Sequence, residues 1–199
     1  MRKSVFWGLA NLRNRFRFAE YGRDVYIHPM AIISRPKYMA IGDGCRIGAY
    51  ASIYLHPLEK IHTGPLLVLG KGVFVGIRCV ISAHYRVELK DNVLLGPNVL
   101  IVDAHHRYED ITVPIRKAGM TEKSFVVVEE EAWIGMNSCI FRGVTVGRHS
   151  VVGANSVVNT DVPPYTVVVG NPARVVRRFD HDMGQWVDCN SDWKSSEVA

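Results

Sequence analysis

The chain has an aliphatic residue at every sixth position through most of its length, and this spacing limits its fold more than any other feature. The positions form these runs: Ile27 and Ile33; Ile41, Ile47 and Ile53; Leu69, Val75 and Ile81; Leu89, Leu95 and Ile101; and Val128, Ile134, Ile140, Val146, Val152 and Val158. A helical face repeats near every 3.6 residues and a strand face near every two, so a period of six matches neither. It is the hexapeptide signature of a parallel β-helix.

Each hexapeptide reads as a short strand followed by a turn, and three of them would close one triangular coil. The aliphatic residue would point inward and stack on its equivalent one coil away. Glycine often follows it, where a corner needs unusual dihedral angles or close backbone approach. These glycines are Gly42, Gly48, Gly70, Gly76, Gly96, Gly135, Gly147 and Gly153. A β-sandwich would instead show period-two alternation with irregular turn spacing.

The rhythm divides the chain of 199 residues into three parts. Residues 22–180 hold the repeats and are predicted to form one β-helix domain, with loops at 56–66 and 104–126. An N-terminal amphipathic helical segment, 1–21, precedes the domain, and a polar C-terminal tail, 181–199, follows it. A loop as long as 104–126 without structure of its own is uncommon in a compact domain and is usually functional.

Helical segments are expected at both ends of the coil. Within residues 1–18, apolar residues recur at helical spacing beside arginine and lysine. We favour a helix that caps the first coil or packs on a neighbouring subunit. The alternative is weak contact with an anionic membrane surface, which would place the protein at the inner membrane face. At the other end, Ala173–Phe179 is expected to form a short basic helix after the break at Gly170 and Pro172.

Composition adds limits on partners and setting. The net charge of +5 is compatible with an anionic small ligand, and no DNA- or RNA-reading motif accompanies it, so no nucleic acid is expected. Cys45, Cys79 and Cys139 fall at repeat positions where small residues line the coil, so we interpret them as core residues. The chain has no C-x-x-C motif, so no structural zinc site is expected, and a reducing, cytoplasmic setting fits best. No window approaches ~18 uninterrupted apolar residues, so no membrane-spanning helix is expected.

Three further motifs accompany the repeats: the loop beginning DAHHRYED at Asp103, the segment Trp133-Ile-Gly, and the terminal Gly170-Asn-Pro-Ala. With them, about residues 22–180 resemble the hexapeptide-repeat acyltransferases, in the branch of maltose, galactoside and cell-surface polysaccharide O-acetyltransferases. The resemblance implies a left-handed β-helix, a homotrimer and acetyl-CoA as donor. It also implies active sites between subunits, beside the extruded loop.

The resemblance places the family's catalytic histidine on His106, where the last strand of one coil leaves for the long loop. A sugar hydroxyl is a poor nucleophile until a base with a pKa near neutral accepts its proton, and imidazole suits that task. The second ring nitrogen must be held by a carbonyl or carboxylate to set the tautomer. Asp103, Glu109 and Asp110 are the nearby candidates for this role.

No serine or cysteine nucleophile with a matching base is evident, so direct transfer through a ternary complex is expected. The tetrahedral intermediate needs a hydrogen-bond donor near its oxyanion. By resemblance, the backbone N–H of Met136, just after Trp133-Ile-Gly, is that donor.

The resemblance also places acetyl-CoA along the groove between adjacent β-helices. The residues expected to line that groove or meet the CoA phosphates are Trp133, Gly135, Ala154, Asn159, Thr160, Arg174 and Arg177. Guanidinium groups suit phosphate because they donate two hydrogen bonds in a fixed plane.

The expected function is therefore acetyl-CoA-dependent O-acetylation of a sugar hydroxyl in cell-surface polysaccharide biosynthesis, without a metal. An amine or an antibiotic is an alternative acceptor. A γ-carbonic-anhydrase-like metal hydratase would share the fold, but it would need zinc held by three histidines across neighbouring subunits. A non-catalytic trimeric scaffold is a further alternative. Stoichiometric zinc without CoA binding would favour the hydratase, and an inert substitution of His106 would favour the scaffold.

Overall fold

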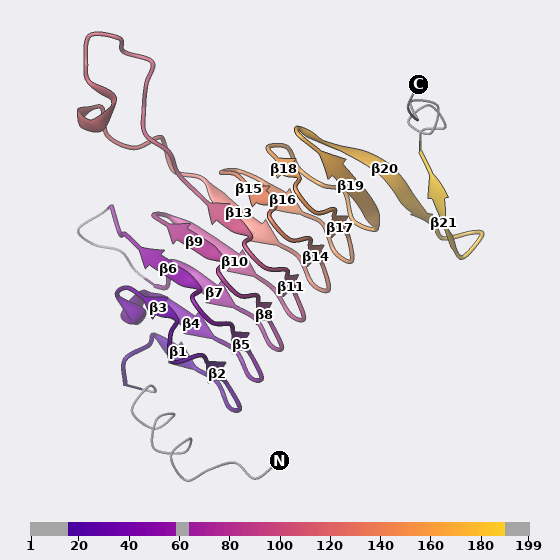
Figure 1. Cartoon of the computed structure of the whole chain (residues 1–199), viewed down its shortest axis with the longest axis horizontal. Helices are drawn as coiled ribbons and strands as arrows, with labels where there is room; N and C mark the ends of the chain where they lie inside the picture. Colours follow the sequence, from indigo (N-terminus) through magenta and orange to yellow (C-terminus); the bar gives the residue numbers. More distant parts are fainter. Residues whose placement is uncertain (1–15, 59–63, 190–199) are drawn as a thin grey trace.

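The computed structural model describes residues 16–58 and 64–189. Most of the expected N-terminal helix, and the end of the C-terminal tail, lie outside the described residues. Within them the chain is an all-β, left-handed parallel β-helix in which three sheets form the sides of a triangular prism (Figure 1). The fold class predicted from the hexapeptide rhythm is confirmed.

Successive strands pass in turn through three sheets, named here sheets A, B and C. Sheet A contains β1 (Glu20–Tyr21), β4 (Met39–Ile41), β7 (Leu67–Leu69), β10 (Arg86–Leu89), β13 (Phe125–Val128) and β16 (Thr145–Val146). Sheet C contains β3 (Ile32–Ile33), β6 (Ser52–Leu55), β9 (Val80–Ala83), β12 (Leu100–Val102), β15 (Cys139–Ile140) and β18 (Val157–Val158). All strand pairs within these two sheets are parallel, because each coil repeats the path of the one before.

Sheet B begins in the same way and ends differently. Its parallel strands are β2 (Tyr26–Ile27), β5 (Arg46–Ile47), β8 (Phe74–Val75), β11 (Leu94–Leu95), β14 (Trp133–Ile134), β17 (Val151–Val152) and β19 (Thr166–Gly170). Two antiparallel strands follow, β20 (Ala173–Asp180) and β21 (Gln185–Asp188). They form a ribbon that extends away from the stacked coils (Figure 1).

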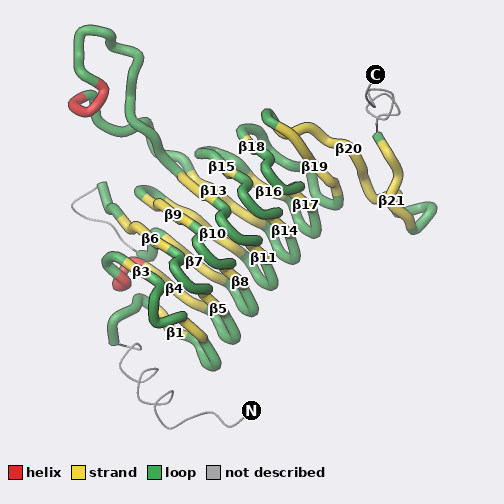
Figure 2. The backbone as a smooth tube through the Cα atoms, in the orientation of Figure 1, coloured by secondary structure: helices red, strands yellow, loops and turns green. Residues whose placement is uncertain are grey.

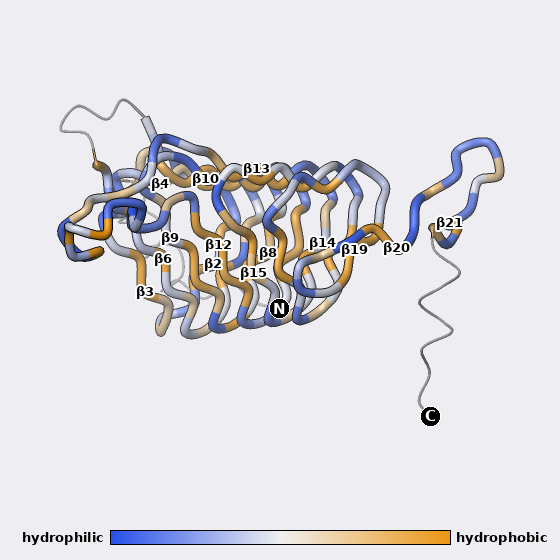
Figure 3. The backbone as a smooth tube through the Cα atoms, turned by 90° about the horizontal axis from the view of Figure 1, so that it is seen from above, coloured by the Kyte–Doolittle hydropathy of each residue, from blue (hydrophilic) through white to orange (hydrophobic). Residues whose placement is uncertain are grey.

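The hexapeptide positions form the interior. From Ile41 to Val158 every aliphatic residue of the rhythm is buried, while Ile27 and Ile33 are partly buried against the same core. Strand register places equivalent residues on top of each other, as in Val75 on Leu95 on Ile134. Hydrophobic segments therefore recur at the same place in successive coils (Figure 3).

A second interior position takes small residues whose polar atoms reach a glycine carbonyl. Cys45 Sγ donates to the carbonyl oxygen of Gly70 at 2.9 Å, and Cys79 Sγ to that of Gly96 at 3.1 Å. Both cysteines are buried, as expected. The expectation for Cys139 is wrong, because Ser138 fills this position and Cys139 faces outward on β15, where it is half-buried. A strand alternates its faces, so one residue separates an interior side chain from an outward one.

The described residues contain two short 3₁₀ helices, η1 (Pro36–Tyr38) and η2 (Ile115–Lys117). The helix expected over Ala173–Phe179 is wrong, since this segment is the strand β20. Its neighbours explain the difference: β19 and β21 pair with β20 on both edges and satisfy its backbone groups. None of the described helices is long and apolar enough to cross a membrane.

The longest departure from the coil lies between β12 and β13. Residues 103–124 leave the corner between sheets C and A and project from the prism as an extended loop that contains η2 (Figure 2). We call residues 103–124 the extruded loop. After it, β13 resumes sheet A in register with β10, with Val87 paired to Val126 and Leu89 to Val128.

Candidate active site

The extruded loop is closed at its base by a short antiparallel neck. His106 and Met120 form a bridge, and Arg107 N–H donates to the carbonyl of Gly119 at 3.0 Å. Thr121 N–H donates to the carbonyl of His105 at 2.9 Å. His106 therefore stands on an ordered part of the loop, where its side chain is exposed to solvent.

The three carboxylates expected to orient the His106 ring are engaged elsewhere. Glu109 accepts from the backbone N–H of Tyr108 at 3.0 Å, and Asp110 accepts from Thr112 Oγ1 at 2.6 Å. Hydrogen bonds from backbone N–H groups lower the pKa of the Glu109 carboxyl below its usual value. The pKa of the Asp110 carboxyl is also lowered, mainly by the hydrogen bond from the Thr112 hydroxyl. Asp103 is fully buried beneath the loop and accepts backbone N–H groups. Within the described part of the chain, no carboxylate forms an ion pair with His106.

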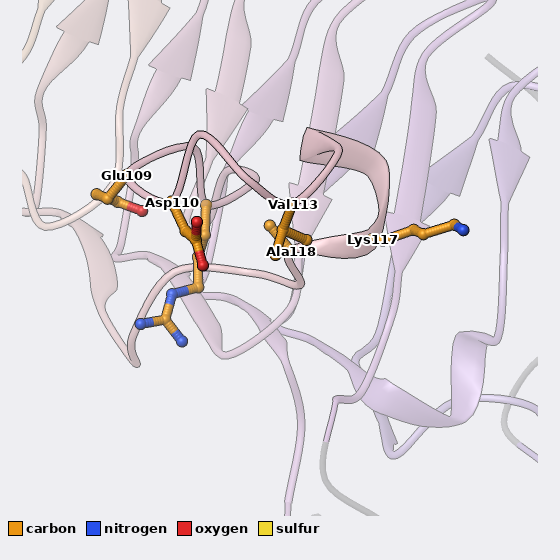
Figure 4. Close-up of a pocket in the computed structure, with 6 residues that line it drawn as sticks. Glu109, Asp110, Val113, Lys117 and Ala118 are labelled. Atoms are coloured by element: carbon orange, nitrogen blue, oxygen red, sulfur yellow. The ribbon is translucent and has the colours of Figure 1, made fainter.

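A cavity of about 360 Å³ opens within the extruded loop, immediately after His106 in sequence. It is lined by Arg107, Glu109, Asp110, Val113, Lys117 and Ala118. Val113 and Ala118 give it an apolar part, and the Lys117 ammonium extends away from the two carboxylates (Figure 4). A small polar molecule of mixed character would suit this lining.

The corner between sheets B and C brings together Gly135, Met136 and Ala154. Gly135 packs so closely on the next coil that a Cβ there would meet Ala154 N at 2.6 Å, which accounts for the glycine. The Met136 carbonyl accepts a hydrogen bond from Asn155 N–H at 2.9 Å, and the Met136 N–H has no acceptor among the described residues. An amide with a free N–H at a surface corner can donate to a bound oxyanion.

The far end of the prism brings together two of the expected CoA contacts. Thr160 and Arg174 line one cavity of about 310 Å³, together with Val158, Asp161, Val162, Val168, Ala173 and Val175. Asn159 is exposed beside Thr160 at the end of β18. Arg177 is held differently, because its Nε pairs with Asp188 Oδ1 on β21 at 3.0 Å. Arg177 is therefore less free than Arg174 to meet a phosphate.

Within one chain, His106 and Met136 lie at opposite corners of sheet C. Asn98 and Asn137 mark one corner, where their side-chain amides are bonded at 3.0 Å. From Asn98 the chain runs through β12 to Asp103 at the other corner, and five residues of extended strand span roughly 16 Å. The base and the oxyanion donor expected from the sequence are therefore not brought together by a single chain.

Two polar residues of the loop neck were not predicted to matter. Thr121 Oγ1 accepts from His105 N–H at 3.3 Å, and Ser124 Oγ donates to the Asp103 carbonyl at 2.6 Å. Both lie where the hexapeptide rhythm is interrupted, so no sequence pattern distinguishes them from other loop hydroxyls. Among the residues the structure places, no three His, Cys, Asp or Glu side chains gather as a metal site requires.

Comparison with known proteins agrees with this architecture. A family model described as the hexapeptide repeat of succinyl-transferase matches residues 125–160. The solved structure of a hexapeptide-repeat containing acetyltransferase from Vibrio cholerae is 30% identical, with a TM-score of 0.54, over 89% of this chain and 84% of that chain. The chain belongs to the hexapeptide-repeat acyltransferase family.

Other relatives match this chain over a smaller share of their own length, or are less similar to it in sequence. The galactoside O-acetyltransferase of Escherichia coli is 39% identical over 48% of this chain and 46% of its own length. A probable acetyltransferase of Mycobacterium tuberculosis is 40% identical over 49% of this chain and 32% of its own. The chain thus spans less than half the length of these curated relatives. An N-acyltransferase from Bacillus cereus, AntD, shares the fold, with a TM-score of 0.73 at 19% identity over 87% of this chain and 90% of its own.

Proposed function

We propose that this protein is an acetyl-CoA-dependent O-acetyltransferase that modifies a sugar hydroxyl in cell-surface polysaccharide biosynthesis. The observation that carries the proposal is the exposed imidazole of His106, held on the ordered neck of the extruded loop beside a cavity. The similar E. coli enzyme acetylates galactosides, and the Vibrio cholerae relative has been solved in complex with acetyl-CoA.

In the proposed reaction His106 is the general base. Its imidazole accepts the proton of the sugar hydroxyl as the hydroxyl oxygen attacks the thioester carbonyl carbon. The carbonyl oxygen becomes an oxyanion that accepts a hydrogen bond from Met136 N–H. The carbon–sulfur bond then breaks, the CoA sulfur takes the proton from the imidazolium, and the acetyl ester remains on the sugar.

The same proposal assigns the donor to the corner of sheets B and C and the end of the prism. The thin pantetheine arm would run past Trp133 and Ala154, which are exposed on either side of the buried Gly135. Asn159 and Thr160 would continue this path, and Arg174 would meet a CoA phosphate beside Thr160. Arg177 would bind a CoA phosphate after its ion pair with Asp188 breaks.

A homotrimer belongs to this proposal for two reasons. Since His106 and Met136 lie at opposite corners of sheet C, a neighbouring copy can supply one to the other across an interface. Sheet B also exposes three large apolar side chains in register, with exposed fractions of 42% for Phe74, 42% for Leu94 and 49% for Trp133. Contiguous apolar surface of this kind is typical of protein contacts.

The test measures release of the CoA thiol with a panel of sugars, nucleotide-sugars and amines. Sugar hydroxyls should be acetylated, and His106→Ala should lower kcat by about 10²- to 10⁴-fold while calorimetry still detects CoA binding. The matched control is His105→Ala, because His105 is also exposed but its ring only stacks on Tyr108, at 6.1 Å.

The other outcomes of this test point to other functions. Full activity in the His106 variant would remove its role as base. Transfer to amines alone would make the protein an N-acetyltransferase. Binding of stoichiometric zinc without CoA would favour a metal hydratase, and binding of neither would favour a scaffold.

A further inference from the structure

We propose that Asp103 is a positioning residue for this reaction: its buried side chain fixes the loop neck that holds His106. The inference rests on the proposed function, because it concerns the geometry of the base. Asp103 is the first residue after β12 and the first of the extruded loop, and it has no exposed surface.

The Asp103 carboxylate gathers the backbone of the neighbouring corner. Oδ1 accepts from His84 N–H at 2.8 Å, and Oδ2 accepts from Tyr85 N–H at 2.8 Å and from Arg86 N–H at 2.7 Å. His84 and Tyr85 form the turn between β9 and β10, and Arg86 begins β10, one coil before the loop. A buried carboxylate is costly unless several donors satisfy it, and here three converging amides do so.

The same residue ties the two ends of the loop together. The Asp103 carbonyl accepts from Ser124 Oγ at 2.6 Å, and Ser124 immediately precedes β13. Tyr85, whose amide meets the Asp103 carboxylate, donates its hydroxyl to the Thr121 carbonyl at 2.6 Å. The carboxylate of Asp103 therefore holds the corner beneath the loop, and its backbone carbonyl holds the end of the loop.

His106 lies three residues beyond this anchor, and the chain between them is held throughout. Ala104 is buried, and both backbone groups of His105 are bonded to Thr121. Among the described residues, the imidazole recorded beside the Asp103 carboxylate is that of His84, with Nδ1 at 3.6 Å, so the carboxylate does not orient the His106 ring directly. Asp103 acts through the backbone, which sets where the imidazole stands relative to a bound hydroxyl.

The first experiment measures acetyl transfer by Asp103→Asn and by a control variant in which another aspartate is changed to asparagine. The amide places an NH₂ group against backbone donors, so at least one of the three contacts must open. We expect kcat to fall by about 10- to 100-fold, because a displacement of about 1 Å is enough for such a loss. The KM for acetyl-CoA should stay within about twofold, since the donor residues lie elsewhere.

The control is Asp43→Asn. Asp43 also bridges coils, accepting Arg23 N–H at 2.7 Å, but it lies at the corner of sheets A and B, far along the chain from the loop. Its kcat and KM should match those of the wild type. A wild-type kcat in Asp103→Asn would overturn the inference, as would equal losses in the two variants.

A second readout does not depend on activity. Hydrogen exchange should quicken in peptides covering 104–122 of Asp103→Asn while peptides covering β4 to β8 keep their protection. If Asp103→Asn does not fold, Tyr85→Phe takes its place, because it removes the hydrogen bond to the Thr121 carbonyl and leaves the buried carboxylate unchanged. It should also quicken exchange in the loop, but by less than Asp103→Asn would. Unchanged exchange in the loop of both variants would contradict the inference, whereas inactivity of the wild type with every acceptor would instead contradict the proposed function.

Discussion

At the scale of single residues, the interior of each coil has one position that combines small volume with a hydrogen-bond donor. Cys45 and Cys79 occupy it in early coils, and Ser138 occupies it later, where Oγ donates to the Gly153 carbonyl at 2.8 Å. Each donor satisfies a carbonyl at the tight corner of the next coil. A thiol and a hydroxyl are interchangeable here because both are small and both donate.

The buried thiols should be unreactive. Burial raises the pKa of Cys45 and of Cys79 to about 11, so both remain protonated at pH 8. The thiolate is the reactive form, and its fraction should rise only as the pH approaches that value. Mass spectrometry after labelling of the native protein with iodoacetamide at pH 8 should find Cys189, which is exposed, modified and both buried cysteines intact. Modification of Cys79 at a rate comparable to Cys189 would show that the corner opens readily.

At the scale of elements, glycine serves two different purposes at the corners. Gly76 has an ordinary backbone conformation, but a Cβ there would meet the Gly96 carbonyl oxygen at 2.6 Å. Gly44 has φ of 74°, and a Cβ there would come no closer than 4.0 Å to its neighbours, an ordinary van der Waals contact. Asn92 occupies the equivalent corner position two coils later with φ of 59°, so asparagine is compatible with that conformation.

This difference predicts effects of different size on stability for two substitutions. Gly76→Ala should lower the free energy of unfolding by about 1–3 kcal/mol, because backbone of the next coil must move. Gly44→Asn should change it by no more than about 0.5 kcal/mol, since a Cβ there makes no clash and asparagine tolerates left-handed backbone. Urea denaturation followed by circular dichroism measures both. A larger loss at Gly44 than at Gly76 would refute this assignment of roles.

At the scale of the whole molecule, a stack of coils presents long flat faces and leaves its ends and edges to be covered. At the C-terminal end, Asp161 accepts Thr145 N–H at 2.7 Å and so covers the edge of sheet A. Sheet B continues instead into the ribbon of β20 and β21. Its outer face keeps the exposed apolar row of Phe74, Leu94 and Trp133.

If this row forms the proposed trimer contact, a charge placed in its centre should dissociate the assembly. Leu94→Glu should shift the mass measured by light scattering from trimer to monomer, because an unpaired carboxylate cannot be buried cheaply. The control is Phe125→Glu, a similarly exposed apolar residue at the start of β13 in sheet A. A trimer that survives Leu94→Glu but not Phe125→Glu would move the interface to the other face.

The hexapeptide spacing was enough to predict the prism and its inward side chains. Ile134, for example, could be assigned to the core because each repeat contacts its neighbours in the same way, so one spacing specifies every layer. The same logic located the interruption from which His106 projects. Cys139 was misplaced by one residue, which in a strand is enough to exchange the interior for the surface.

The parts of the chain outside the hexapeptide period depend on contacts that only the folded structure reveals. Asp103 finds its partners at His84, Tyr85 and Arg86 in another coil, and these contacts follow from how the loop leaves the corner. Ala173–Phe179 is a strand because β19 and β21 offer edges to pair with, whereas a short basic helix was expected after the break at Gly170 and Pro172. The conformation of the repeats follows from contacts between adjacent coils, which the spacing encodes. The conformation of loops and edge strands depends on pairing with backbone groups that are distant in the sequence.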